Sequence, residues 1–473
     1  MKSLDFGAAG SLRTSLFAGI AAAALMTPGL AHAQDEAQPA QPADQAQPAE
    51  GEGNEIVITA TKRERTLQDT PVAVSVTTAA TIERAQIRDI TDLSSVVPSL
   101  KVSQNQSQAA TSYAVRGFGT SGNNLGLEPS VAVFVDGVYR SRAIAQISDL
   151  PEIQRVEVLR GPQSTLFGKN ASAGVISIVT RQPSYNFGGS IEGSYGNYNA
   201  AVVKGYITGA LTDTVAASLS AGYNRRDGYL TNAFNGDKMN NRDRWFARGQ
   251  LRFDPTDNLK VRLIADYDKI DEKCCGVVNL RPSAATGAVQ LVGGQVNNYL
   301  TPYADVVYSD VVPTSKVRNW GLSGQIDYTM GPLTVTSITA YRDTKIDAQQ
   351  DVDFTSAALA SGANIGEANI HTFTQELRLA SNLEGPVNFL LGGYYFNEKL
   401  QTADQIVYGK DFRPYVSMLI QGATGGTLNA NSVEFLLGAP ANTFWQAGQG
   451  FFNQMHQADE AWSLFGNVDF KPI

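Results

Sequence analysis

The feature that most constrains this chain is an alternation of apolar and polar residues with a period of two, which begins near residue 188 and recurs to the C-terminal end. In one segment Val261 and Leu263 would project from one face of a strand, and Lys260 and Arg262 from the other. Alternation of this kind predicts β-strands with one apolar face. The C-terminal part of the chain is therefore expected to form an antiparallel sheet.

About ten segments show this alternation. They are residues 188–195, 200–210, 213–225, 243–253, 258–270, 316–329, 333–347, 368–380, 387–400 and 459–470. Strands that span a membrane need about 9–11 residues, whereas the strands of a soluble β-sandwich usually have about 5–6. The lengths favour a transmembrane β-barrel, and a soluble β-sandwich is the alternative.

The connections between these segments alternate in length from the second one onward. Short turns occur at 211–212, 254–258, 331–332 and 382–386, and long connections at 226–242, 271–315, 348–367 and 401–458. Outer-membrane barrels have short periplasmic turns and long outer loops. The connection 196–199 is an exception, because an outer loop is expected there and the connection is short. No segment after the N-terminal region has an apolar run of about 18 residues, so a membrane protein with this sequence would have to be a closed barrel.

The N-terminal region predicts export. A charged start, the apolar run 16–26 and small residues around Ala33 predict a secretory signal peptide over residues 1–33. Residues 34–54 are rich in Gln, Ala, Pro and acidic residues, and this composition predicts a disordered tether.

Residues 66–182 have a different pattern and predict a compact, mixed α/β domain. Short apolar runs indicate strands at 72–76, 131–135, 153–159 and 175–179, and short helices are expected at 81–88 and 91–97. The fold class is therefore a mixed α/β domain followed by an antiparallel transmembrane β-barrel of about ten strands.

No motif in the sequence predicts catalysis or metal binding. The net charge of −8 argues against a nucleic-acid binder. Asp136-Gly137 predicts a turn, and the stretch 161–169 lacks the spacing of a phosphate-binding loop. The two cysteines, Cys274 and Cys275, are adjacent and are expected to be loop residues or a local vicinal disulfide. We expect no enzymatic activity, no cofactor and no bound metal.

Several motifs within residues 55–182 resemble, in order, those of TonB-dependent outer-membrane receptors. The first is the TonB box, which Glu55, Ile56, Val57, Ile58, Thr59 and Ala60 resemble. The plug signatures that match are Arg116-Gly117, Asp136-Gly137, Arg160-Gly161-Pro162, Gly168 and Gly174. The resemblance implies a TonB box with its adjoining segment at 55–65, a plug domain at 66–182 and a partial barrel at 188–473.

The resemblance also implies a function. TonB-dependent receptors take up scarce nutrients, most commonly ferric siderophores; cobalamin, haem, glycans and aromatic compounds are the other ligand classes. The ligand would bind the outer loops and the plug, and the inner-membrane TonB protein, with ExbB and ExbD, would pull on the box. An extended peptide such as 56–58 can add a strand to a partner's sheet, or it can be the first strand of the plug itself. The protein would lie in the outer-membrane lipid of a Gram-negative bacterium, and we expect it to be monomeric.

Arginines at positions such as Arg116 and Arg160 commonly pair with acidic residues of the barrel wall in this family. Glu376 lies on the polar face of its predicted strand, so it would point inward. We hypothesise that Glu376 pairs with Arg116 or Arg160 and fixes the plug to the wall. The alternative is a solvated surface charge.

Other functions are less well supported by the sequence. Ten strands could not enclose a folded plug, whereas about 22 strands could, so we expect an incomplete barrel, and a truncated, non-transporting remnant is an alternative. A signal transducer would need an extra folded domain before the TonB box, and an open porin would need no plug. The long loops are expected to select the ligand, and the candidate contacts are Tyr299, Tyr303, Tyr308, Trp445 and Phe451.

Overall fold

The computed structural model describes residues 57–470, apart from residues 60, 64, 69, 147, 148 and 150. The expected signal peptide and tether lie outside the described residues, as do Glu55, Ile56 and Ala60 of the expected TonB box. No helix in the described part of the chain is long and apolar enough to cross a membrane.

The plug domain is built on a five-stranded sheet with the strand order β3-β9-β10-β7-β8. Its strands are β3 (Val74–Thr78), β7 (Val131–Val135), β8 (Val138–Arg140), β9 (Ile153–Arg160) and β10 (Gly174–Thr180). All neighbours are antiparallel except β7 and β10, which are parallel. The four strands predicted for this domain are therefore confirmed, with their ends shifted by one or two residues.

Short helices and a second sheet complete the plug. The helix predicted at 81–88 is shorter and begins earlier, as α1 (Ala79–Arg84), and the segment predicted as a helix at 91–97 forms only the 3-10 turn η1 (Asp92–Ser95). A small sheet, not predicted from the sequence, is formed by β4 (Leu100–Gln104), β5 (Thr111–Val115) and β6 (Phe118–Gly119). The remaining short elements are η2 (Gln108–Ala110), η3 (Ala143–Gln146) and α2 (Ser164–Phe167).

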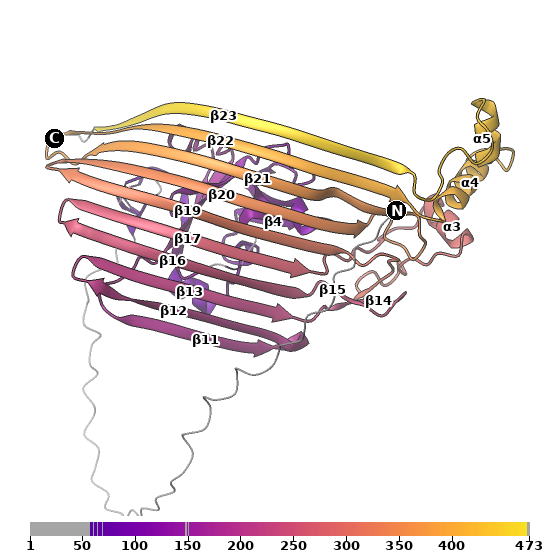
Figure 1. Ribbon diagram of the computed structural model, residues 1–473, viewed down its shortest axis with the longest axis horizontal. Helices are drawn as coiled ribbons and strands as arrows, with labels where there is room; N and C mark the ends of the chain where they lie inside the picture. The colour runs from indigo at the N-terminus through magenta and orange to yellow at the C-terminus, as the bar shows by residue number, and fades with distance from the viewer. Residues whose placement is uncertain are drawn as a thin grey trace, which may run out of the picture. The chain divides into compact units, whose positions relative to one another are not determined.

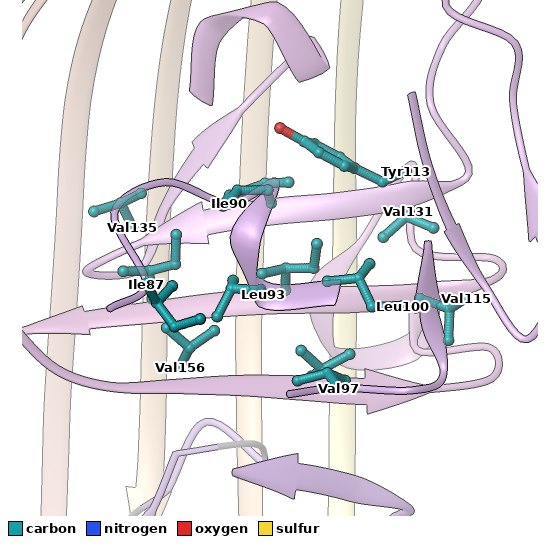
Figure 2. Packing of buried hydrophobic residues seen from close by; sticks show 14 of the residues in the cluster. Ile87, Ile90, Leu93, Val97, Leu100, Tyr113, Val115, Val131, Val135 and Val156 are labelled. Atoms are coloured by element: carbon teal, nitrogen blue, oxygen red, sulfur yellow. The ribbon is translucent and has the colours of Figure 1, made fainter. Parts of the chain in front are cut away.

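A dry core holds these parts together. Figure 2 shows aliphatic side chains of the 87–100 segment, including Ile90 and Leu93, packed over Val135 and Val156 of the sheet. Ile90, Leu93 and Val156 are fully buried. Burying a side chain of this size contributes about 1.5–3 kcal/mol, so the 3-10 turn is held in place by its packing and not by helical propensity.

The C-terminal part forms a wall, one sheet of ten antiparallel strands in sequence order (Figure 1). The strands are β11 (Gly188–Gly196), β12 (Ala200–Thr212), β13 (Val215–Arg226), β16 (Arg242–Thr256), β17 (Leu259–Glu272), β19 (Thr314–Met330), β20 (Leu333–Asp351), β21 (Ala360–Ser381), β22 (Val387–Tyr408) and β23 (Gly450–Phe470). Each of the ten predicted segments forms one of these strands. A 3-10 turn, η4 (Asn197–Asn199), makes the short first connection.

The two faces of the wall have opposite chemistry. Leu251, Leu263 and Leu377 point away from the plug, and 43–53 % of each side chain is exposed. The alternating residues Arg248 and Arg262 are at most 9 % exposed, because the plug covers them. A water-soluble sandwich would bury the leucines and expose the arginines, so this pattern excludes that alternative for the wall.

The sheet is not closed among the described residues, since no pairing joins β23 to β11. Both edge strands therefore present unpaired backbone groups. The prediction of about ten antiparallel strands is confirmed.

The long connections lie at one end of the wall and contain structure that the alternation could not predict. They include β14 (Leu230–Asn232), β15 (Lys238–Met239) and β18 (Val306–Val307), which form a small sheet, and the helices α3 (Ala284–Leu291), α4 (Phe412–Ala423) and α5 (Ala430–Leu436). Figure 1 shows the three helices together at this end. Cys274 and Cys275 form a disulfide just after β17, which is one of the two states expected for them.

Candidate functional site: the N-terminal segment and the plug–wall interface

The described part of the expected TonB box is docked on the protein. Val57 and Ile58 form β1, which pairs with β2 (Arg65–Thr66) and not with the plug sheet. Ile58 is buried in an apolar cluster with Leu159 of the plug and Phe396 of the wall. Val57 remains 45 % exposed. The peptide is thus held by the buried side chain of Ile58 and by the pairing of the two-residue strands β1 and β2.

Hydrogen bonds add a second hold on this peptide. The Thr59 backbone N–H donates to Oε1 of Glu157 over 2.9 Å, and Glu157 also pairs with Arg155 over 2.7 Å. Glu157 and Arg155 both belong to β9, the strand that ends at Arg160 of a plug signature. The strand that leads into this signature therefore contacts the N-terminal segment.

Glu376 points inward as predicted, but its expected partner was wrong. It pairs with Lys62, with 2.7 Å between Lys62 Nζ and Glu376 Oε2, and both side chains are at most 7 % exposed. Arg378, two residues along β21, lies 3.4 Å from the same carboxylate. Burial lowers the pKa of Lys62, and Glu376 offsets this only in part. The ion pair thus holds the segment after the expected TonB box against the wall, because Lys62, and neither plug arginine, contacts Glu376.

Two more cations of this segment bind a single wall carboxylate. Arg63 lies 2.8 Å from Oδ2 of Asp469, near the end of β23, and Arg65 pairs with the same oxygen. Asp469 is opposite Asn388 in the register of β22 and β23, close to the short turn 382–386. The N-terminal segment therefore lies at the short-turn end of the wall.

A cavity of 980 Å³ lies beside this segment. Its lining combines the segment, the plug and the short turns, including Lys62, Asp136, Asp254, Asn258, Asn382 and Glu376. Both polar and charged groups line it, so water can enter it. The Lys62–Glu376 ion pair, here called the clasp, therefore borders this water-accessible cavity and does not lie in a dry core.

Asp136 joins the plug to the wall. It occupies the turn between β7 and β8, and its carboxylate pairs with Arg248 of β16 and with Arg262 of β17, the latter over 3.3 Å. Thr180 donates its backbone N–H and its hydroxyl to the same carboxylate over 3.0 and 2.8 Å. Burial would raise the pKa of Asp136, but the two arginines and Thr180 hold it below its usual value. The predicted turn is confirmed; its role in fixing the plug was missed.

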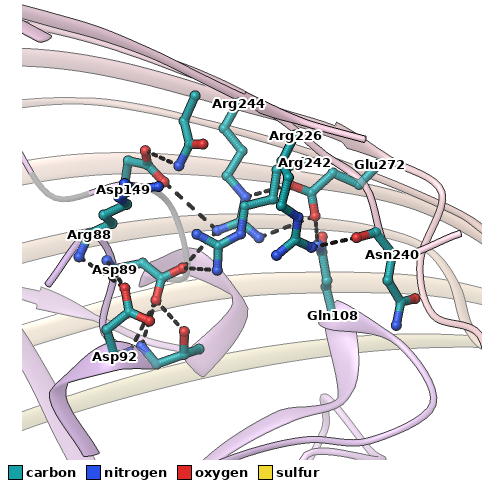
Figure 3. Close-up of polar contacts among 12 residues, drawn as sticks. Arg88, Asp89, Asp92, Gln108, Asp149, Arg226, Asn240, Arg242, Arg244 and Glu272 are labelled. Carbon is teal, nitrogen blue, oxygen red and sulfur yellow. Dashed lines mark hydrogen bonds and ion pairs between the residues drawn. The ribbon is translucent and has the colours of Figure 1, made fainter. Parts of the chain in front are cut away.

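A second ionic cluster surrounds Asp89 (Figure 3). Arg242 and Arg244 of β16 each lie 3.1 Å from Oδ2 of Asp89. Arg244 also pairs with Glu272 of β17 over 2.5 Å, and Gln108 of the plug donates to Glu272. Asp89 is fully buried; burial would raise its pKa, but the two arginines and hydrogen bonds from Thr91 and Asp92 lower it.

A third contact is Arg142 of the plug with Glu398 of β22, 3.0 Å apart and both at most 3 % exposed. The partners of Asp136 and Asp89 lie on the neighbouring strands β16 and β17, and the partner of Arg142 lies on β22. Sequence reasoning missed them because Asp89 and Arg142 belong to no motif. The only available signal was the charge on inward positions of the wall strands, such as Arg248 and Arg262.

The remaining signature residues shape the plug backbone. Arg116 and Gly117 follow β5 at a turn with positive φ, and Arg160 ends β9. In the described part of the chain neither arginine forms an ion pair. Gly174 begins β10, where a Cβ atom would lie 2.6 Å from the Leu159 carbonyl oxygen, so glycine is required for the close pairing of β9 and β10. Gly161, Pro162 and Gly168 flank α2.

Comparisons with known proteins agree with this architecture. The family profile "TonB-dependent Receptor Plug Domain" matches residues 66–175. The pesticin receptor of Yersinia pestis is 31 % identical over 169 residues, which are 36 % of this chain and 25 % of that protein. An iron-regulated outer membrane virulence protein of Vibrio cholerae is 29 % identical over 202 residues, which are 38 % of this chain and 29 % of that protein. The chain thus spans about a quarter of the length of these relatives.

Solved structures share the fold. The ferric yersiniabactin uptake receptor of Yersinia pestis superposes with a TM-score of 0.61 at 18 % identity, covering 85 % of this chain and 62 % of the other. A siderophore receptor of Acinetobacter baumannii has a TM-score of 0.59 at 15 % identity, covering 85 % and 56 %.

The fold and the interface define a plug domain that is held by ion pairs and apolar contacts against a ten-stranded β-wall with an exposed apolar face. The family match identifies residues 66–175 as a TonB-dependent receptor plug domain, and the chain is similar over part of its length to outer-membrane receptors and shares the fold of solved ones.

Proposed function

We propose that this chain serves energy-coupled uptake of a ferric siderophore, with the short turns in the periplasm and the long loops outside. The observation that carries the proposal is the position of the N-terminal segment. Its described TonB-box residues and Lys62 are clasped at the short-turn end, beside a water-accessible cavity of 980 Å³. A periplasmic partner could reach the segment there without crossing the membrane.

In this proposal TonB, coupled to ExbB and ExbD, takes the segment 55–60 as an added β-strand. Val57 already has an extended backbone, and its side chain is half exposed. Strand addition needs backbone groups and alternate side chains, so the β1–β2 pairing and the Thr59–Glu157 hydrogen bond would exchange for bonds to the partner. Pulling would next load the Lys62–Glu376 pair.

The plug–wall interface suits a domain that must move and then return. Its contacts include ion pairs and hydrogen bonds around Asp136, Asp89 and Arg142, beside apolar packing such as that of Ile144 with wall residues of the same cluster. Water can replace the partners of such groups when the plug shifts, whereas an apolar interface would lose its full burial energy. Charged pairs also fix the position in which the plug docks.

A working receptor needs a closed wall. The unpaired edges of β11 and β23 would have to be covered by further strands, because lipid cannot satisfy exposed backbone groups. Transport is therefore proposed for the assembly in which these edges are paired.

The ligand class rests on the relatives and on the loops. Two solved neighbours are named as receptors for ferric yersiniabactin and for a siderophore. Tyr299 and Tyr303 are exposed in the connection between β17 and β19, and Phe451, predicted in a loop, is exposed at the start of β23. These aromatic side chains could pack on the flat rings of such a ligand. Their role as contacts remains a prediction.

Uptake of iron tests the proposal. Iron-starved cells that lack their own siderophore receptors would express this chain and receive radioactive iron bound to a catecholate, a hydroxamate or a phenolate siderophore. We expect uptake of one of these complexes, its loss in cells without TonB, and its loss in Val57→Pro, which cannot pair as a strand. Val57→Thr keeps the β-prone side chain and is the control. Equal uptake with and without TonB would contradict the proposal, and so would no uptake of any complex by protein present in the outer membrane.

A further inference from the structure

Three aspartates at the long-loop end of the wall lie unusually close together. Asp310 precedes β19, Asp351 ends β20, and Asp353 follows in the connection to β21. One carboxylate oxygen from each lies within 4.8 Å of the others. In the described part of the chain none of the three forms an ion pair.

Two carboxylate oxygens of these aspartates are buried and have no hydrogen-bond partner among the described residues. They are Oδ1 of Asp310 and Oδ2 of Asp351. Asp351 as a whole is only 3 % exposed, and its other oxygen accepts the backbone N–H groups of Asp353 and Phe354 over 3.0 and 2.9 Å. A buried, unpaired carboxylate oxygen next to two more carboxylates is costly unless a proton or a cation lies between them.

The nearby positive charge does not neutralise the three aspartates. Lys410 is the cation that acts on Asp310, but its ammonium group is exposed and pairs with Asp411 over 2.9 Å. Burial and the charge of Asp353 raise the pKa of Asp310 to about 6, and burial raises that of Asp353. The three acids are thus a site of unbalanced negative charge.

We propose that Asp310, Asp351 and Asp353 bind a calcium ion. Calcium takes six to eight oxygen ligands at about 2.3–2.6 Å, so two oxygens bound to one ion are at most about 5.2 Å apart. The three carboxylate oxygens meet this limit, since they lie within 4.8 Å of one another. The donors are all oxygen, and a set with neither nitrogen nor sulfur disfavours zinc and copper. Mg²⁺ is disfavoured because it demands a near-ideal octahedron.

The position of the site gives the ion a structural consequence. The connection between β20 and β21 also carries Ala357 and Leu359, which pack with Val289 of α3 and Phe412 of α4. The backbone N–H of Asp310 donates to the Thr355 carbonyl over 3.1 Å. A calcium ion would therefore join the segment before β19 to the platform on which α3 and α4 rest, and would stiffen the outer loops.

Direct binding tests the site without reference to transport. Calorimetric titration of the purified full chain in detergent with CaCl₂ should show one saturable site, with a Kd on the order of 0.1–1 mM, as in other extracellular modules. Asp351→Asn and Asp353→Asn should each weaken binding at least tenfold, because each removes a charged ligand. Asp305→Asn is the control, since Asp305 is exposed in the same connection and should bind as the unaltered chain does.

Hydrogen exchange gives the second readout. Calcium should slow exchange in residues 308–312 and 351–360 of the unaltered chain and have no effect in Asp351→Asn. If Asp351→Asn fails to fold, Asp310→Asn replaces it, because Asp310 is only partly buried. Absence of saturable binding at millimolar calcium would overturn the proposal. Equal binding by the unaltered chain and the aspartate variants would overturn it as well, and a proton shared among the acids would then explain their burial.

Discussion

The clasp between Lys62 and Glu376 leads to the most informative prediction. Glu376→Ala removes a carboxylate that is 2.7 Å from the Lys62 ammonium group, and both side chains are nearly buried. Loss of one partner from a buried pair costs about 3–5 kcal/mol, because the other charge stays buried and unpaired. Water in the adjacent cavity of 980 Å³ should reduce this cost, so we take the lower limit, about 3 kcal/mol.

That free energy can be read as a release equilibrium. Each 1.4 kcal/mol is a factor of about ten, so Glu376→Ala should raise the population of the released segment roughly 100-fold. Arg63, Arg65 and Thr59 keep their contacts with Asp469 and Glu157. The segment should therefore remain docked for most of the time, with frequent excursions.

Trypsin measures these excursions, because the segment contains Lys62, Arg63 and Arg65. When opening is fast compared with cleavage, the cleavage rate follows the open population. We expect cleavage after Arg65 of the folded protein to accelerate roughly 100-fold in Glu376→Ala. Glu367→Ala, an exposed position on the same strand, is the matched control and should cleave at the original rate.

A double variant separates the pair from other effects of the mutation. Lys62→Met combined with Glu376→Ala leaves no unpaired buried charge, so cleavage should be slower than in Glu376→Ala alone. A cleavage rate in Glu376→Ala within twofold of the original would show that the Lys62–Glu376 pair does not hold the segment. So would a double variant that cleaves as fast as the product of the two single effects.

Further predictions concern the plug. Asp136→Asn should weaken plug docking by about 3 kcal/mol, because Arg248 and Arg262 lose their counter-charge. Hydrogen exchange of β7 and β8 should then accelerate. The control Asp213→Asn, at an exposed turn, should leave this exchange unchanged. Asp136 and Asp89 have folded-state pKa values below their ordinary ones, so their stabilisation is complete above about pH 4 and is lost as the pH falls further. Protection of the plug from hydrogen exchange should therefore be constant from pH 7 to pH 5 and fall at lower pH. An equally steep loss in a variant with both aspartates replaced by Asn would contradict this. Gly174→Val should destabilise the plug by about 2–4 kcal/mol, because its Cβ would meet the Leu159 carbonyl at 2.6 Å. Thermal unfolding should show a lower Tm. The control Gly205→Ala should leave the Tm unchanged, because a Cβ there meets nothing within 4 Å.

The wall could be predicted well from sequence, because each strand needs only its own alternation. Leu263 and Arg262 differ in polarity, and their opposite exposure follows directly from the pleat. The helices α3, α4 and α5 could not be predicted in this way, since they lie within long connections that carry no period of two. Their existence depends on packing among loops, as between Val289 and Phe412.

The site was only half predictable for a similar reason. The inward direction of Glu376 follows from its place on a strand, but its partner depends on where a distant segment docks. Lys62 and Glu376 are 314 residues apart in the sequence. The ion pairs of Asp89 and Arg142 likewise join residues with no motif, so only the tertiary structure reveals them.

The proposed function requires that TonB pulls the chain by its N-terminal segment from the periplasmic side. A photo-cross-linking residue at Val57, which is half exposed, would test it in living cells, with and without the transported ferric siderophore. We expect a cross-link to TonB that increases when the ligand is added and is lost when 55–60 is replaced by a glycine-serine sequence. A cross-link that forms only with other proteins, or that is indifferent to the sequence of 55–60, would contradict it.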